Sequence, residues 1–497
     1  MKENKFNHLN AISRRQFIRR ACCATIGTIG MTAALRDLRL MNAAVAQSNL
    51  SDYKALVCIF LAGGNDANNL IVPTLTQEYG NYASLRTPDL ALPRGALLNL
   101  KKPGTSVDYV DPAGHSFGFH PACPELRTLF GEGKLATLFN VGTLAFPITR
   151  DQYQAGIIPT PPQLFSHADQ QTQWQTSVVD QPPTTGWGGR CADLLNSVQP
   201  GAPISMSISL AGANTFEIGN LVAQYSVSTD GAIPLAAIAD TRLATLTNTL
   251  GLSYANLQKQ AYARIAQHSI QSGNLLNNAI ANTAAANYWN SPFPVDIVVP
   301  NGGIVYGSDL SAQLLMVARL IEAGNRAAAN GGFGMKRQIF FCQVDGYDLH
   351  TGQTDYATNT PNNVIVGAHA DLLAELSQSL YGFQRAMEQL GLSQNITAFT
   401  ASDFGRTFPS NGVGSDHGWG SHHLICGGAV KGGKTYGTFP ALAVDGPDDT
   451  DTGRWIPTTA IDQYFATLAQ WFGVNSSNIP TVFPNVGRFA APNLGFV

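Results

Sequence analysis

The sequence predicts an α/β fold in which a mostly parallel sheet is flanked by helices. Four apolar runs support this prediction, at residues 55–61, 134–142, 337–344 and 396–402. Each run is apolar at successive positions, as in parallel strands that are covered on both faces. Helical patterns lie between the runs, and this alternation is typical of layered α/β proteins with right-handed crossovers.

Two of the intervening helical patterns are clear. Residues 371–391 place a stripe of apolar side chains on one face, at Leu373, Leu376, Leu380, Phe383, Met387 and Leu390. Residues 312–324 form a second apolar pattern with helical spacing. The region 200–301 differs, because it is rich in Ala, Asn, Thr and Ser and carries no group of ligand-type residues. We expect it to be an insertion that caps the functional crevice.

Bulk properties exclude several classes of protein. The chain has 497 residues, of which 44% are hydrophobic and only 13% charged, with a net charge of −3. It therefore lacks the basic footprint of a nucleic-acid-binding protein. After the N-terminal segment, no apolar run reaches the ~18 residues of a membrane span, so we expect no stable membrane anchor. The cysteines beyond residue 46 are scattered, which predicts neither a disulfide framework nor a zinc–thiolate site.

The N-terminal segment has the pattern of a twin-arginine (Tat) export signal. SRRQFIRR at residues 13–20 is followed by the apolar ATIGTIGMTAAL and then by AVAQ. A twin arginine, an apolar stretch and a small-residue cleavage site predict a signal peptide at residues 1–46, cleaved after Ala46. An amphipathic basic helix is the alternative. With the signal, the Tat translocon would be a partner during export, and the mature protein would be periplasmic or secreted.

Polar residues of metal-ligand type follow the predicted strands. Asp66, Asp348 and Asp403 each come shortly after one of them, His350 lies two residues past Asp348, and His417 follows Asp403 closely. In an open α/β sheet, the carboxyl ends of the strands converge on one crevice, where ligands bind. A single Asp after a strand is usually a turn or helix cap. Several together favour a functional site.

Carboxylates and imidazoles in one crevice suit a hydrolytic metal centre. These side chains bind divalent ions such as Zn²⁺ and Mn²⁺. Two ions about 4 Å apart can hold the attacking and leaving oxygens of a displacement at phosphorus or sulfur. We therefore expect one or two divalent ions (Zn, Mn, Ca or Mg) and an ester substrate, either a small molecule or a polymer.

The chain resembles the alkaline phosphatase superfamily, and within it the Tat-exported domain-of-unknown-function 1501 family. The resemblance rests on LVCIFLAGGNDANNLIVP, LFSHADQQTQWQ, TGWGGRCADLL, DGYDLHTGQ, SDFGRT and SDHGWGSHHLICGGAVKGG, and it covers nearly all of residues 47–497. It implies an alkaline-phosphatase-like domain. It also implies metal-ligand roles for Asp66, Asp348, His350, Asp403 and His417. One position departs from the superfamily, because Phe404 stands where a histidine usually follows the aspartate.

The resemblance also implies a nucleophile at the start of a helix. Ser166 is the candidate, with His167 beside it, but Ser166 is equally well explained as a helix cap with Asp169 as its capping-box partner. Asn69 is a second candidate for a substrate or metal contact. Arg406 is suited to binding a phosphate or sulfate bidentately, or to an ion pair that holds its loop. Asp416 is expected to orient His417 or to cap a turn.

Two functions from different classes fit these residues. The first is an exported metal-dependent hydrolase of phosphate or sulfate esters, in which Ser166, His167 and Arg406 are the catalytic candidates. The second is a non-catalytic exported protein of the same fold that keeps a degenerate or single metal site, and Phe404 favours it.

Overall fold

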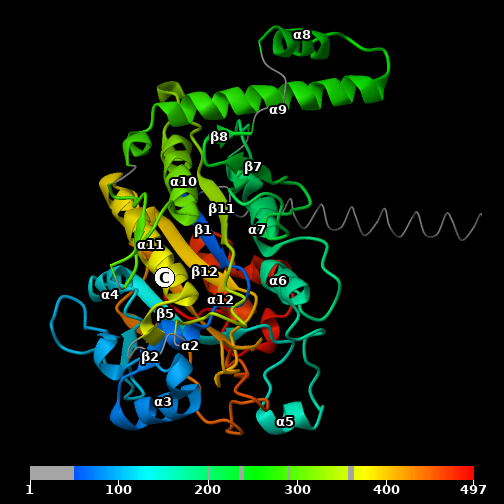
Figure 1. Ribbon diagram of the computed structural model, residues 1–497. Helices are drawn as coiled ribbons and strands as arrows, with labels where there is room; N and C mark the ends of the chain where they lie inside the picture. The colour runs from blue at the N-terminus through cyan, green and yellow to red at the C-terminus, as the bar shows by residue number, and fades with distance from the viewer. Residues whose placement is uncertain (1–49, 200, 234–239, 289–290, 301, 356–362) are drawn as a thin grey trace, which may run out of the picture.

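The computed structural model describes residues 50–199, 201–233, 240–288, 291–300, 302–355 and 363–497. The expected signal peptide at residues 1–46 lies outside these ranges. Within them, no helix is both long and apolar enough to cross a membrane. Figure 1 shows a central sheet with helices packed against it.

The described part of the chain forms a ten-stranded central sheet. In spatial order its strands are β14 (Lys434–Tyr436), β5 (Leu135–Gly142), β13 (Ser421–Gly427), β12 (Ile396–Ser402), β1 (Lys54–Leu61), β11 (Arg337–Val344), β6 (Ser207–Ser209), β7 (Tyr225–Ser228) and β8 (Gly231–Ala232), with β15 (Thr459–Ala460) paired to β5. β5, β12, β1, β11 and β6 run in one direction, whereas β13 runs antiparallel between β12 and β5. The sheet is therefore mixed but mostly parallel, and the predicted fold class is confirmed.

All four predicted strands are present, as β1, β5, β11 and β12. β5 and β12 are buried at every position, and β1 is buried after its first residue. In the middle of β1, Cys58 pairs with Phe341 on one side and with Phe399 on the other. Burial on both faces explains why these strands are apolar at successive positions. The five cysteines in the described ranges are all buried and free.

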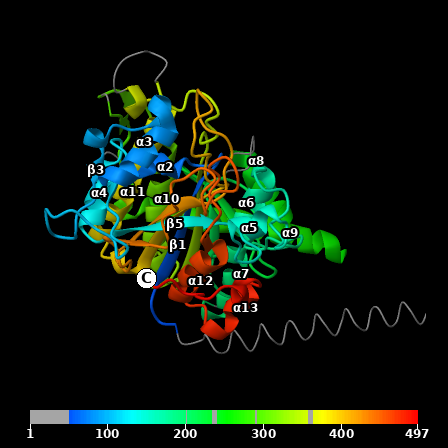
Figure 2. The ribbon, with the colours of Figure 1, turned by 90° about the horizontal axis from the view of Figure 1, so that it is seen from below.

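Helices cover both faces of the sheet, as Figure 2 shows. One layer consists of α4 (Pro124–Gly131), α10 (Asp309–Asn325) and α11 (Ala368–Gln389). The opposite layer consists of α6 (His167–Thr176), α7 (Trp187–Leu195), α12 (Ile461–Phe472) and α13 (Ile479–Val482). Within that second layer, Trp187 stacks on Phe465 with ring centroids 4.6 Å apart. The two predicted helical patterns are confirmed as α10 and α11.

Short elements gather beyond the carboxyl end of β1. They are α2 (Ala67–Leu70), β2 (Ile71–Pro73), α3 (Thr76–Leu90), β3 (Leu98–Asn99), β4 (Phe117–Phe119) and α5 (Arg150–Gln154). α3 is kinked at Thr87, whose φ of 56° is not helical. α2 begins one residue after Asp66, so it starts beside the predicted crevice.

Part of the region 200–301 belongs to the central sheet. Its strands β6, β7 and β8 continue the central sheet beyond β11. Its helices α8 (Asp240–Leu250) and α9 (Leu257–Ala281) lie at the end of the molecule opposite α2 and α3 (Figure 1). The short strands β9 (Ile297–Val298) and β10 (Ile304–Val305) form a separate hairpin. Backbone pairing to β11 therefore decides the position of this region.

The segment around His422 and His423 forms an interior strand. Both histidines belong to β13 and are buried. β13 pairs with β12 and β5. Its two histidines and its final glycine hid the strand pattern, because neither residue type is characteristic of strands.

Candidate metal centre

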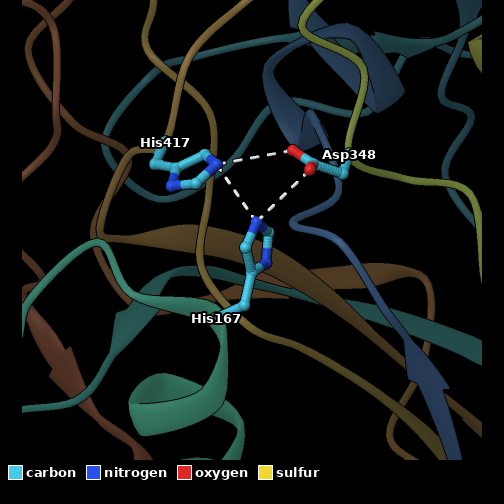
Figure 3. Close-up of side chains that lie close together, drawn as sticks. All are labelled: His167, Asp348 and His417. Carbon is cyan, nitrogen blue, oxygen red and sulfur yellow. Dashed lines mark hydrogen bonds and ion pairs between the residues drawn. The ribbon is translucent and has the colours of Figure 1, made fainter.

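Three side chains from distant segments meet at the carboxyl ends of the parallel strands. Asp348 follows β11, His417 lies between β12 and β13, and His167 is the first residue of α6. Figure 3 shows both imidazole rings directed at the Asp348 carboxylate. The two Nε2 atoms are 3.1 Å apart. Each lies 3.4 Å from an Asp348 oxygen, Oδ1 for His417 and Oδ2 for His167.

His350 extends this group. Its Nε2 atom lies 2.8 Å from Nε2 of His417 and 3.2 Å from Oδ1 of Asp348. Three imidazole nitrogens and one carboxylate therefore adjoin one another. We call His167, Asp348, His350 and His417 the metal-site residues.

The other ring nitrogen of each histidine is held by an acceptor. Nδ1 of His167 lies 2.6 Å from Oδ2 of Asp403, and Nδ1 of His350 lies 2.8 Å from Oδ1 of Asp416. Nδ1 of His417 lies 2.7 Å from the carbonyl oxygen of Phe165. A carbonyl and an ionised carboxylate only accept hydrogen bonds, so all three Nδ1 atoms carry the proton. Metal-binding histidines are usually held in this way.

These hydrogen bonds leave three Nε2 lone pairs facing one another. Neutral imidazoles in this state cannot donate to each other, so the lone pairs require a shared positive partner. Donors about 2.0–2.1 Å from a tetrahedral zinc ion lie about 3.3 Å apart. The separations among His167, Asp348 and His417 are 3.1, 3.4 and 3.4 Å. The donor set therefore fits one divalent ion.

The electrostatics of the site keep Asp348 ionised. Burial opposes its ionisation, but the hydrogen bond and positive charge of Arg406 outweigh burial and lower the pKa of this carboxyl. The Arg406 Nη1 atom lies 2.8 Å from Oδ1 of Asp348. The Asp348 side chain is 46% exposed, so the site opens to solvent on the side of this carboxylate.

Both Nη atoms of Arg406 donate to protein acceptors, whereas its buried Nε atom has no partner in the described part of the chain. Besides Asp348, it donates to the carbonyl oxygens of Gly63 and Ser415, and it is buried. This arrangement matches the ion pair that holds a loop, and it leaves little of the guanidinium for a substrate.

Asp403 contacts Nδ1 of the metal-site residue His167. It is fully buried, and its carboxylate accepts three hydrogen bonds, from His167, from Nε2 of Gln171 at 2.9 Å and from the Gly63 amide at 3.2 Å. The sequence made Asp403 a ligand and His167 a catalytic residue. In the structure their places are exchanged, because α6 carries the His167 ring between Asp403 and His417.

Asp66 is held apart from the metal-site residues. Its Oδ2 atom accepts from Arg86 and Gln353, and the carboxylate is buried. Among the described residues, no hydrogen bond or ion pair joins Asp66 to His167, Asp348 or His417. Burial opposes its ionisation, but the charges of Arg86 and His369 and the hydrogen bonds from Arg86 and Gln353 lower the pKa of this carboxyl. Asp348, His350 and His417 therefore adjoin one another, whereas Asp66 contacts Arg86 and Gln353.

Ser166 precedes α6 in the N-cap position. Its hydroxyl donates to Oδ2 of Asp169 at 2.6 Å. In the described part of the chain, no hydrogen bond joins Ser166 to Asp66 or Asp403. Ser166 Oγ accepts no backbone N–H of α6, so the side-chain capping contact is not formed, and its hydroxyl is engaged by Asp169 instead. Asn69 is also occupied, since its side chain bonds Tyr82, Arg86 and the Leu90 carbonyl.

Phe404 closes the inner side of the site. Its ring centroid is 4.8 Å from that of His167 and 4.7 Å from that of His417, and it is buried. An apolar wall here excludes water from behind the imidazoles. Asp416 was expected to orient His417 or to cap a turn, but it orients His350 instead.

Sequence reasoning missed two supporting groups. The Phe165 carbonyl and the Gln171 amide hold His417 and Asp403. A carbonyl leaves no trace in a sequence. The pattern of His167 and Gln171, four residues apart at the start of a helix, was the available signal, since such residues share one helix face.

Comparison with solved structures finds chains described as sulfatases and phosphatases. A sulfatase from Pseudoalteromonas sp. is 11% identical, with 89% of this chain and 73% of that chain covered and a TM-score of 0.32. A chain from Bacteroides thetaiotaomicron, titled for the metabolism of multiple glycosaminoglycans, is 11% identical, with 86% and 74% covered and a TM-score of 0.34. A mutant of the alkaline phosphatase PafA is 11% identical, with 72% and 64% covered and a TM-score of 0.22.

No curated protein matches the chain. The family model described as "Protein of unknown function (DUF1501)" matches residues 53–453. Since this match spans most of the sequence, the chain belongs to the DUF1501 family.

Proposed function

We propose that this protein is an exported metal-dependent hydrolase of phosphate or sulfate esters. The observation that carries the proposal is the convergence of three imidazole Nε2 lone pairs on one exposed carboxylate. Every Nδ1 atom is already held by an acceptor, which is the arrangement of a metal site. A solvent-open position beside such ligands is typical of catalytic rather than structural sites.

The proposed ligands are His167, Asp348 and His417, with His350 as a fourth donor. A set dominated by imidazole favours zinc or manganese over calcium or magnesium. When bound, such an ion supplies positive charge that polarises the ester and activates water.

The remaining residues have supporting roles in this proposal. Asp403 and Asp416 hold the Nδ1 protons of His167 and His350, so that the Nε2 lone pairs stay available. Arg406 keeps Asp348 ionised and fixed in orientation. Because the Ser166 hydroxyl is bonded to Asp169, we infer that water attacks the ester directly.

The proposal also includes export of the protein from the cytoplasm. The twin-arginine pattern at residues 13–20 supports Tat transport, cleavage after Ala46 and a periplasmic or secreted mature protein. Its partners would be the Tat translocon during export and a small or polymeric ester afterwards. We propose neither a nucleic-acid partner nor a membrane anchor.

A non-catalytic role is the second candidate. It is favoured by Phe404, which replaces a potential imidazole ligand with an apolar ring, and by the engagement of Ser166 with Asp169. In that case the single metal would stabilise the loops or bind a ligand without turnover.

One experiment separates these candidates. The purified mature protein is analysed for metal content and assayed with aryl phosphates and aryl sulfates. We expect bound zinc or manganese and metal-dependent turnover, and His417→Ala should lose both. His115→Ala is the matched control, since His115 pairs with Glu78 outside the metal site and both properties should persist. Bound metal without turnover of either ester class would favour the non-catalytic role, and absence of metal would refute both.

A further inference from the structure

We propose that the protein binds a single metal ion per chain, and that a buried ion pair of Asp66 with Arg86 occupies the place of a second ion. This inference rests on the proposed metal site and deepens it. It assigns Asp66 a role other than the metal-ligand role expected from the sequence.

The Arg86 guanidinium is fixed beside Asp66. Its side chain is 0% exposed and pairs with Oδ2 of Asp66. Its other donors contact Oδ1 of Asn69 at 3.2 Å and the carbonyl oxygens of Phe408 and Thr407 at 2.8 and 3.3 Å. A buried arginine with these partners cannot move aside or lose its charge. A divalent ion on Asp66 would lie beside a fixed positive charge in a weakly screened interior.

Three buried histidines near Asp66 are in the wrong tautomer to bind a metal there. Nδ1 of His120 accepts from the Ala122 amide at 3.0 Å, and Nδ1 of His422 accepts from the Asn140 amide at 3.1 Å. Nε2 of His369 lies 3.0 Å from Oδ1 of Asn65, to which it donates.

A neutral imidazole has one lone pair. His120 and His422 therefore have protonated Nε2 atoms, and Nε2 of His369 is protonated too. The metal-site histidines have the opposite pattern, with Nδ1 protonated and Nε2 bare. The hydrogen-bond partners thus separate the proposed metal-binding histidines, whose Nε2 atoms are bare, from three histidines whose Nε2 atoms carry the proton.

The Oδ1 atom of Asp66 agrees with the proposal that no metal ion binds there. Oδ1 of Asp66 and Nε2 of His422 are both buried without a hydrogen-bond partner in the described part of the chain. The negative charge of Asp66 acts on His422, since it raises the pKa of that imidazole against the larger lowering by burial. The unpartnered Oδ1 acceptor of Asp66 therefore interacts electrostatically with His422, which carries the unpartnered Nε2–H donor. One buried water could satisfy both groups.

The test is metal stoichiometry measured on the full mature chain. After removal of metal with a chelator, Zn²⁺ is titrated by calorimetry, and zinc per chain is determined by elemental analysis after desalting. We expect one equivalent. Two tight equivalents would overturn this inference while leaving the hydrolase proposal intact. No tight equivalent would overturn both.

Two variants test which residues bind the ion. Asp66→Asn combined with Arg86→Met removes both buried charges together and so leaves neither one unpaired. This double variant should still bind one equivalent of Zn²⁺ with an affinity within threefold of the wild type. Asp348→Asn, the control at an exposed carboxylate, should weaken binding at least tenfold. Loss of Zn²⁺ binding by a folded double variant, checked by circular dichroism, would show that Asp66 is a ligand.

If the double variant does not fold, a crystal of the wild-type protein soaked in Zn²⁺ decides the question. One anomalous peak among His167, Asp348 and His417 supports the inference. A second peak at Asp66 overturns it.

Discussion

Asp403→Asn tests whether the Asp403 carboxylate, which accepts a hydrogen bond from Nδ1 of His167, strengthens metal binding at the site. Asp403 is fully buried and accepts hydrogen bonds from His167, Gln171 and the Gly63 amide. An asparagine of the same shape has one acceptor oxygen and one NH₂ group. At least one of the three N–H donors would then face another donor, and the negative charge beside His167 would be lost.

The expected magnitude follows from this geometry. Changing the partner that orients a metal-binding histidine typically costs 10–100-fold in metal affinity, which corresponds to about 1.4–2.8 kcal/mol. The mismatched donor should also lower the free energy of unfolding of the metal-free protein by about 1–3 kcal/mol, as for an unsatisfied buried polar group.

The assay is a competition titration of Zn²⁺ against a chromogenic chelator, with unfolding in urea of the metal-free protein as a second measurement. Asp416→Asn is the matched control, because Asp416 orients His350 in the same way but its side chain is 48% exposed. Water can replace part of its contact, so a smaller loss of affinity is expected. A folded Asp403→Asn variant that binds Zn²⁺ as tightly as the wild type would refute the assignment.

Three further predictions concern other parts of the chain. Ser166→Ala removes the hydrogen bond to Asp169, so it should cost ~1 kcal/mol of stability in a melting curve and leave ester turnover nearly intact; abolished turnover with normal metal content would make Ser166 the nucleophile. Burial lowers the pKa of His423 to about 3, below the ~6.5 of the unfolded chain, so its neutral form contributes stability that is present above pH 6.5 and lost as the pH falls toward 3. In chelated protein, His423→Phe should therefore make the fall in unfolding free energy between pH 6 and 4 shallower by about 1.4 kcal/mol per pH unit, and an unchanged slope would contradict this. Replacing Arg14 and Arg15 by Lys should retain the uncleaved precursor in the cytoplasm, as detected by fractionation and immunoblotting, whereas normal processing would exclude Tat export.

The fold was largely predictable because its main signals are local. The apolar runs that became β1, β5, β11 and β12 are visible in the sequence, since burial on both faces requires apolar residues at successive positions. β13 was not visible, because its two histidines and its final glycine do not form a strand pattern. Its interior place depends on hydrogen bonds to β12 and β5, which are distant in sequence.

The candidate site was predictable in part. The sequence alone determined that Asp348, His350 and His417 lie near one another, because carboxyl ends of parallel strands meet at one edge of a sheet. Only the tertiary structure decided which groups offer lone pairs. His167 meets Asp403 across 236 positions of the chain, and His417 meets the Phe165 carbonyl across 252. These contacts set the protonated nitrogen of each ring, and Arg86 pairs with Asp66. Residue type and order do not encode the direction of a hydrogen bond between such distant segments, so packing had to determine it.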